Sequence, residues 1–269
     1  MQSPGGTISR AAIEAHGLVK TYPAPRKTRV RALDGLTLSV PHGTIYALVG
    51  PNGAGKTTTV KILTTLAAAD EGTARIEDID VRTDPAQVRR VIGVVGQRSG
   101  ADPMATGREN LILQGHLYGQ PTRAARRRAD ELLERFRLTE AAGRFVRAYS
   151  GGMQRRLDVA LGLMHRPRVL FLDEPTTGLD PEARTAMWDE IIRLAESDAV
   201  TVLLTTHYLD EADRLASRIA VVDQGRVVAE GEPARLKREL DVTSLDDVYL
   251  HYAGRRYSDA TRLTEVAGR

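Results

Sequence analysis

The sequence contains no cysteine, which excludes disulfide bonds and cysteine-ligated zinc and is consistent with life in the cytosol. No stretch approaches the roughly 18 consecutive apolar residues of a membrane-spanning helix, so none is expected. Residues 1–10 contain Pro, Gly and Ser but no apolar segment of the kind found in a secretory signal, and no signal is expected either. These absences favour a chain that folds and works in the cytosol.

Lysine is also rare, and arginine supplies nearly all of the positive charge. The lysines are Lys20, Lys27, Lys56, Lys61 and Lys237. A formal net charge of +3 over 269 residues gives no reason to expect a nucleic-acid partner. The arginine run at 126–128 is interpreted as a solvated helix face, with polyanion binding as the alternative. The length and a hydrophobic content of 42% suit a globular protein with one large domain or two modest ones.

One stretch fits the phosphate-binding pattern G-x-x-x-x-G-K-[ST]. Its residues are Gly50, Pro51, Asn52, Gly53, Ala54, Gly55, Lys56 and Thr57. The glycines allow a tight turn whose N–H groups point at phosphate oxygens, Lys56 adds charge for the β- and γ-phosphates, and Thr57 offers a hydroxyl to Mg²⁺. A β-prone run at 44–49 precedes this P-loop, and a helix-like pattern over 58–66 follows it. The helix start, including Thr58, is therefore predicted to face the nucleotide phosphates.

A pair of carboxylates follows a second apolar run. Residues 169–172 are all apolar, as a strand buried on both faces requires, and Asp173 and Glu174 come directly after them. Ligands bind at this carboxyl edge in open α/β sheets. Asp173 is predicted to hold the Mg²⁺ shell, and Glu174 to polarise a water in line with the γ-phosphate. The alternative, that both residues only cap a strand, is disfavoured by the P-loop upstream.

A second helix start suited to an anion lies about a hundred residues after the P-loop. Its residues are Ser150, Gly151, Gly152 and Gln154, at the beginning of an arginine-rich helix. Ser150 can cap that helix and the glycines expose its N–H groups, although a plain helix cap is the alternative. Because two phosphate-facing helix starts accompany one nucleotide, two chains are expected to share each ATP.

The remaining pattern defines the expected architecture. Strands are predicted over 13–15, 36–40, 88–95, 168–172 and 200–205, with hairpins over 73–81 and 219–229. Helices are predicted over 110–118, 122–137, 154–165, 181–195 and 209–215, with an amphipathic segment over 245–252. The fold class is α/β: a P-loop NTPase core with a mixed sheet, an N-terminal antiparallel β subdomain and an inserted helical subdomain at about 98–165. Residues 1–11 are predicted to be disordered, 12–240 to form the ATPase domain, and 241–269 to be a short C-terminal tail.

These motifs occur in the order and spacing of ATP-binding-cassette (ABC) ATPases, which the sequence resembles over about residues 12–240. The resemblance implies that Tyr22 stacks on adenine, that Gln97 senses Mg²⁺ and the permease, and that His207 contacts the γ-phosphate. It also implies that Ser150 and Gly152 cap the ATP held by the opposite subunit. The cofactors are then ATP and Mg²⁺, and ATP closes a homodimer sandwich.

A finer resemblance is to the daunorubicin-resistance type of exporter ATPase, carried by residues 106–111, 149–153, 206–212 and 245–250. It implies a bacterial ATPase subunit that binds an integral-membrane permease at the cytoplasmic face of the cell membrane and drives export of a drug-like or lipid-like compound. Relatives of this type often carry a further small domain before the Leu-Asp-Asp stretch, whereas here only a short segment after Leu240 precedes it.

Other functions within the same family remain open. An importer ATPase is an alternative, because the catalytic core does not report the direction of transport. A non-transport ATPase is another. The ribosome-acting type resembles two fused cassettes, whereas this chain has one P-loop, and the insert is too short for the coiled coil of the DNA-repair type. A binding module without ATPase activity would be expected to lack Lys56 or Glu174, and both are present.

Overall fold

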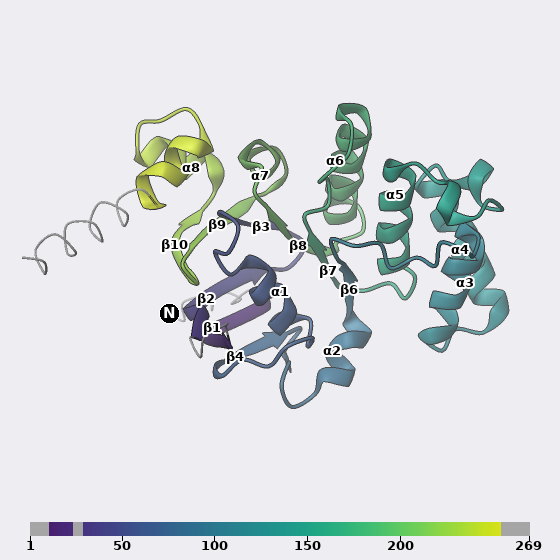
Figure 1. Cartoon of the computed structure of the whole chain (residues 1–269), viewed down its shortest axis with the longest axis horizontal. Helices are drawn as coiled ribbons and strands as arrows, with labels where there is room; N and C mark the ends of the chain where they lie inside the picture. The colour runs from purple at the N-terminus through teal and green to yellow at the C-terminus, as the bar shows by residue number, and fades with distance from the viewer. Residues whose placement is uncertain (1–10, 24–28, 254–269) are drawn as a thin grey trace, which may run out of the picture.

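The computed structural model describes residues 11–23 and 29–253, which form two β-sheets flanked by helices (Figure 1). The smaller sheet is antiparallel, in the order β2-β1-β4-β5. Its strands are β1 (Ala11–Pro23), β2 (Arg29–Pro41), β4 (Glu71–Ile76) and β5 (Ile79–Asp80). The predicted N-terminal antiparallel subdomain is therefore present, built on two strands much longer than the sequence pattern indicated.

The larger sheet has six strands in the order β10-β9-β3-β8-β7-β6. They are β3 (Ile45–Val49), β6 (Ile92–Val95), β7 (Val169–Asp173), β8 (Thr201–Thr206), β9 (Arg218–Asp223) and β10 (Arg226–Gly231). Strands β6, β7, β8, β3 and β9 run parallel, and only β10 is antiparallel to its neighbour. This is the predicted mixed sheet, and it places the carboxyl ends of β6, β7, β8 and β3 along one edge.

Two hydrophobic cores pack against opposite faces of the larger sheet. Along β3, Tyr46 and Leu48 belong to the core shared with the antiparallel sheet and α1 (Lys56–Leu63). Ala47 and Val49 point the other way, into a core shared with the remaining helices. Because both faces are covered, every residue of β3, β7 and β8 is buried, as an apolar run without alternation predicts.

Helices α6 (Pro181–Glu196), α7 (Leu209–Leu215) and α8 (Pro233–Glu239) follow the core strands. The helical insert comprises α3 (Gly107–Leu117), α4 (Thr122–Arg135), η2 (Thr139–Ala141), η3 (Val146–Ala148) and α5 (Gly151–Gly162), to the right in Figure 1. Thr106 begins α3 with a capping box, since its side chain accepts from the Glu109 amide while Glu109 bonds back. Helix α5 lies directly on the sheet: a Cβ added to Gly93 would come within 2.3 Å of the Gly162 carbonyl oxygen.

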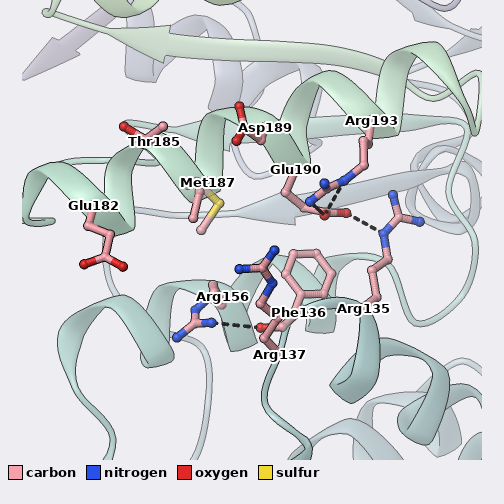
Figure 2. A pocket seen from close by; sticks show the side chains of 11 residues that line it. Arg135, Phe136, Arg137, Arg156, Glu182, Thr185, Met187, Asp189, Glu190 and Arg193 are labelled. Atoms are coloured by element: carbon pink, nitrogen blue, oxygen red, sulfur yellow. Dashed lines mark hydrogen bonds and ion pairs between the residues drawn. The ribbon is translucent and has the colours of Figure 1, made fainter.

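An ion-pair cluster ties the insert to α6 (Figure 2). Arg135, at the end of α4, donates to the buried carboxylate of Glu190 and to Asp198. Arg193 also donates to Glu190, so that this carboxylate is flanked by two guanidinium groups. The cluster borders a cavity of about 400 Å³ between α6 and the insert, which none of the sequence-predicted site residues lines.

The predicted strand over 88–95 is wrong in its first half. Residues Pro85–Val91 form helix α2, and only Ile92–Val95 are a strand. Pro85 suits a first helical turn, and Val88 and Val91 lie three residues apart on the side that packs inward, while Arg89 is exposed. A short apolar run cannot by itself distinguish these two structures.

The ends of the chain also differ from the predicted boundaries. Ala11, expected to be disordered, is the first residue of β1, and residues 1–10 lie outside the described part. In the expected tail, residues 245–253 are helical, in agreement with the amphipathic pattern. Leu245 and Val248 are buried in the same core as the ATPase strands, so this helix is packed on the domain. Residues 254–269 are not described.

Candidate nucleotide site

The P-loop connects β3 to α1 and depends on two glycines for its shape. Gly50 has φ 152°, and a Cβ there would lie 2.2 Å from the Val222 carbonyl oxygen. Gly55 has φ 112°, and a Cβ there would lie 2.6 Å from the Ala32 carbonyl oxygen. Any larger residue at either position would collide with backbone that cannot move independently. The loop is thus packed tightly against the antiparallel sheet and the β9–β10 turn.

A cavity of about 250 Å³ lies over this loop. It is lined by Val30, Ala32, Pro51, Asn52, Gly53, Ala54, Gly55, Lys56, Thr57, Thr58, Gln97 and Glu174. The predicted P-loop residues therefore converge on one hollow, together with Gln97 and Glu174 from two other loops. A volume of this size suits the phosphate end of a nucleotide better than a whole one.

Lys56 is the buried cation of this hollow. Its ammonium donates to the carbonyl oxygens of Gly50 at 2.6 Å and Pro51 at 3.1 Å. Burial lowers the pKa of Lys56, while the nearby carboxylates of Glu174 and Asp173 oppose that shift. The amine thus lies within electrostatic reach of both carboxylates, as the sequence motifs require.

The carboxylates stand at the end of β7. Asp173 is buried, and its Oδ1 accepts a hydrogen bond from the Thr205 hydroxyl on neighbouring β8. Glu174 has φ 51°, a left-handed backbone conformation that a side chain of this size rarely adopts. Its Oε1 lies 3.2 Å from His207 Nδ1, and its Oε2 accepts from the Thr177 hydroxyl at 3.3 Å. Glu174 and His207, far apart in sequence, therefore meet at one point.

The residues that could hold Mg²⁺ are Thr57, Gln97 and Asp173. All three offer oxygen ligands, which Mg²⁺ prefers, and two of them line the P-loop hollow while Asp173 adjoins it. Among residues 11–23 and 29–253, no group of three or more His, Cys, Asp or Glu side chains could hold a metal alone. The set fits a cation that shares its coordination shell with phosphate oxygens and water.

The second helix start behaves as a cap, and its residues do not line the P-loop hollow of the same chain. Ser150 is exposed and its hydroxyl accepts from the Met153 amide at 3.3 Å, which confirms the predicted N-cap of α5. Gly151 and Gln154 line a separate cavity of about 230 Å³, which shares Gln97 and Glu174 with the P-loop hollow. Ser150 and Gly152 line neither cavity. One chain therefore does not bring the P-loop and this helix start together.

Tyr22 differs from its expected setting. It lies within β1, well beyond the predicted strand over 13–15, and it pairs with Val30 of β2. Val30 lines the P-loop hollow, whereas Tyr22 does not. The Tyr22 ring is partly exposed, with the Lys20 ammonium 5.5 Å from its centroid. The tyrosine is thus beside the hollow, on the strand that borders it.

Three contributions to the site escaped the sequence analysis. Val30 and Ala32 line the P-loop hollow, but their side chains are apolar and belong to no recognisable motif. Thr205 orients Asp173 from another strand, which requires knowledge of strand order. Arg155 binds the backbone beside Gln97 and Glu174, but an arginine within an arginine-rich helix gives no signal of its own.

A P-loop between a buried parallel strand and a helix, with an Asp-Glu pair at the end of a neighbouring strand, defines a P-loop nucleoside triphosphatase. Residues 33–177 match the family model described as ABC transporter. The chain belongs to the ABC transporter family and is one of its ATP-hydrolysing subunits. Such subunits work as dimers with membrane permease partners. In the described part of the chain, no helix has the length and apolar character of a membrane span.

Curated relatives narrow the type of ABC subunit. The chain is 51% identical to the daunorubicin/doxorubicin resistance ATP-binding protein DrrA of Streptomyces peucetius, over 94% of this chain and 74% of that protein. It is 42% identical to the Nod factor export ATP-binding protein I of Ralstonia nicotianae, over 87% and 72%. Among solved structures, a dimeric ATP-binding cassette in a post-hydrolysis state with ADP and Pi matches with a TM-score of 0.75 at 28% identity, covering 82% of this chain and 98% of that one.

Proposed function

We propose that this chain is the Mg²⁺-dependent ATPase subunit of a membrane exporter for a drug-like or lipid-like compound. Two copies bind ATP between them and drive an integral-membrane permease from the cytoplasmic face of the cell membrane. The observation that carries the proposal is the convergence of Lys56, Gln97 and Glu174 on one hollow at the carboxyl edge of the sheet. The names of two relatives, a daunorubicin/doxorubicin resistance ATP-binding protein and a Nod factor export ATP-binding protein, support export over import.

The proposed roles follow the positions of the side chains. The P-loop N–H groups, Lys56 and Thr58 bind the phosphates, and the oxygens of Thr57, Gln97 and Asp173 share Mg²⁺. Glu174 accepts a proton from the attacking water, and His207 beside it orients the γ-phosphate. Bound Mg²⁺ would neutralise charge that develops on the phosphates. Ser150, Gly151, Gly152 and Gln154 complete the site of the second copy.

Tyr22→Ala is expected to weaken ATP binding by about 1–3 kcal/mol, the scale of aromatic stacking on a base. The reason is that Tyr22 lies next to the P-loop hollow through its pair with Val30. Titration with a fluorescent ATP analogue measures the change. Tyr22→Phe is the matched control and should bind normally, because it keeps the ring. An unchanged affinity in Tyr22→Ala would place the adenine elsewhere.

Docking on the permease is assigned to an exposed apolar surface of the insert formed by Met104 and Phe145. Met104 is 60% exposed, and Phe145 pairs with Thr106 close beside it. Arg147 bridges the two, with its guanidinium 3.8 Å from the Met104 sulfur and 5.3 Å from the Phe145 ring centroid. An apolar surface of this kind on a chain that works beside a membrane protein marks an interaction site.

Because the chain has no cysteine, Met104→Cys creates a single crosslinking position. In cells that contain the permease, a thiol crosslinker at this position is expected to join the chain to a membrane protein. Leu66→Cys is the control: Leu66 is 70% exposed but follows α1 and is not part of the insert. Crosslinked products are separated by electrophoresis and identified by mass spectrometry. Membrane-protein adducts from Leu66→Cys and none from Met104→Cys would contradict this docking surface.

A further inference from the structure

Arg155 occupies an unusual position in α5, five residues after Ser150. Its side chain is buried, with 8% of the residue exposed. The guanidinium donates to four backbone carbonyl oxygens: Gly96 at 2.6 Å, Pro175 at 2.7 Å, and Asp173 and Glu174 at 3.0 Å each. No described carboxylate forms an ion pair with it. A buried charge that is hydrogen-bonded only to backbone carbonyls, with the carboxylates of Asp158 and Asp173 acting on it without an ion pair, is costly, so its geometry is specific.

The four carbonyls belong to the two loops that carry the chemistry. Gly96 directly precedes Gln97, at the end of β6. Asp173, Glu174 and Pro175 continue from β7 into the loop that holds Glu174. A single rigid guanidinium fork thus fixes these loops relative to each other and to α5. Ser150 caps the start of α5 and is proposed to bind the ATP held by the other copy. Arg155 therefore links this helix start with the loops that carry Gln97 and Glu174 in the same chain.

The contact with Arg155 matters most for the backbone conformation of Glu174. Its left-handed conformation (φ 51°) persists only if neighbouring groups impose it. The Glu174 amide donates to the Thr205 carbonyl at 3.1 Å and approaches the Thr205 hydroxyl at 3.2 Å. Its carbonyl oxygen accepts from Arg155. The peptide groups on both sides of Glu174 are therefore held, one by β8 and the other by Arg155.

We infer that Arg155 is a positioning residue for ATP hydrolysis, which acts through backbone carbonyls to hold Glu174 and the Gln97 loop in place for attack on the γ-phosphate. The inference rests on the proposed role of Glu174. Arg155 does not line the P-loop hollow. It borders the neighbouring cavity with Gly151 and Gln154, where its guanidinium is taken up by backbone carbonyls. Its loss should therefore slow the chemical step without weakening ATP binding.

Arg155→Met is expected to lower kcat by about tenfold to a hundredfold, the scale for a small misplacement of a reacting group. The ATP dissociation constant should stay within about twofold of wild type, since no binding group changes. Arg155→Lys should recover part of kcat, because an ammonium can reach some of the four carbonyls but lacks the fork. Hydrolysis rates and ATP-analogue titrations are measured on the full chain, with thermal melting as a check on folding.

Arg135→Met is the matched control, because Arg135 also ties the insert to the core, through Glu190, but it lines a different cavity from the nucleotide site (Figure 2). It should melt at a lower temperature yet keep its kcat. An equal fall in kcat in this variant would show that any loosening of the insert slows turnover, and would overturn the specific role of Arg155. If Arg155→Met does not fold, Arg155→Lys decides: wild-type kcat contradicts the inference, and a lowered kcat with normal ATP affinity supports it.

A double variant separates positioning from general damage. If Arg155 acts through Glu174, adding Arg155→Met to Glu174→Gln should change the residual single-turnover rate by less than about threefold, because coupled residues are not additive. Full additivity would overturn the inference while leaving the role of Glu174 intact. Near-normal hydrolysis in Glu174→Gln alone would instead overturn the role of Glu174, and the Arg155 inference with it.

Discussion

Glu174→Gln is expected to lower steady-state ATP hydrolysis by about 10²-fold or more while ATP still binds. The amide has the shape of the carboxylate and can keep the contacts with Thr177 and His207. It cannot accept a proton from water, so only the chemical step is lost. Phosphate release measures hydrolysis, and titration with a fluorescent ATP analogue measures binding. The variant should also accumulate ATP-bound dimers, since hydrolysis no longer separates them.

Glu182→Gln is a suitable comparison for this variant. Glu182 is an exposed carboxylate in the first turn of α6, and it lines the cavity of Figure 2 rather than the nucleotide site. Its neutralisation should leave hydrolysis unchanged. Near-normal turnover in Glu174→Gln would remove Glu174 from the role of general base and leave His207 as the next residue to test.

Lys56→Ala and Ser150→Arg are each expected to abolish hydrolysis alone and to recover part of it when mixed. Lys56→Ala removes the buried cation of the P-loop, and Ser150→Arg blocks the exposed start of α5. Within one chain, Lys56 lines the P-loop hollow, whereas Ser150 lines neither that hollow nor the neighbouring cavity. One copy therefore cannot surround a γ-phosphate. A two-fold axis solves this by placing the P-loop of one copy opposite Ser150 of the other, in two equal sites.

The mixing experiment distinguishes shared from separate sites. A heterodimer of the two variants has one site with both defects and one intact site, so hydrolysis per heterodimer should approach half of the wild-type value. Co-purification of the two variants, each with a different affinity tag, establishes that heterodimers form with ATP. A Ser150→Arg chain that is fully active alone would reject the shared site. Complete inactivity of proven heterodimers would show either that the sites are not shared or that both must be intact for turnover.

The sequence allowed the catalytic edge to be predicted because its residues lie in short, continuous motifs. The P-loop and the Asp173-Glu174 pair each follow an apolar run, and apolar runs become buried parallel strands whose carboxyl ends are adjacent. The strand order places β7 next to β8 and β8 next to β3, as the convergence of Lys56 and Glu174 requires. The cap at Ser150 could be predicted for the same reason, because it depends only on residues within one helix turn.

What could not be predicted depends on contacts across the fold. The helix Pro85–Val91 has an apolar pattern too short to distinguish from a strand, and only its packing decides. The extension of β1 to Tyr22 results from pairing with β2, which no local pattern reveals. The carbonyl partners of Arg155 come from loops 18 to 59 residues away. Such long-range backbone contacts leave no trace in side-chain patterns.

The close approach of Gly93 and Gly162 brings the C-terminal end of α5 into backbone contact with β6. At that end the helix meets β6 with no side chain between the two backbones, so a side chain at Gly93 would push the helix off the sheet. Helix α5 has 12 residues and is therefore about 18 Å long. A turn of about 10° around its Gly162 end would displace the Ser150 end by roughly 3 Å. Arg155, nearer the middle, would move by roughly half as much, and its guanidinium would carry the carbonyls of Gly96 and Glu174 with it. A turn of α5 would thus move the Ser150 helix start about twice as far as the loops that carry Gln97 and Glu174.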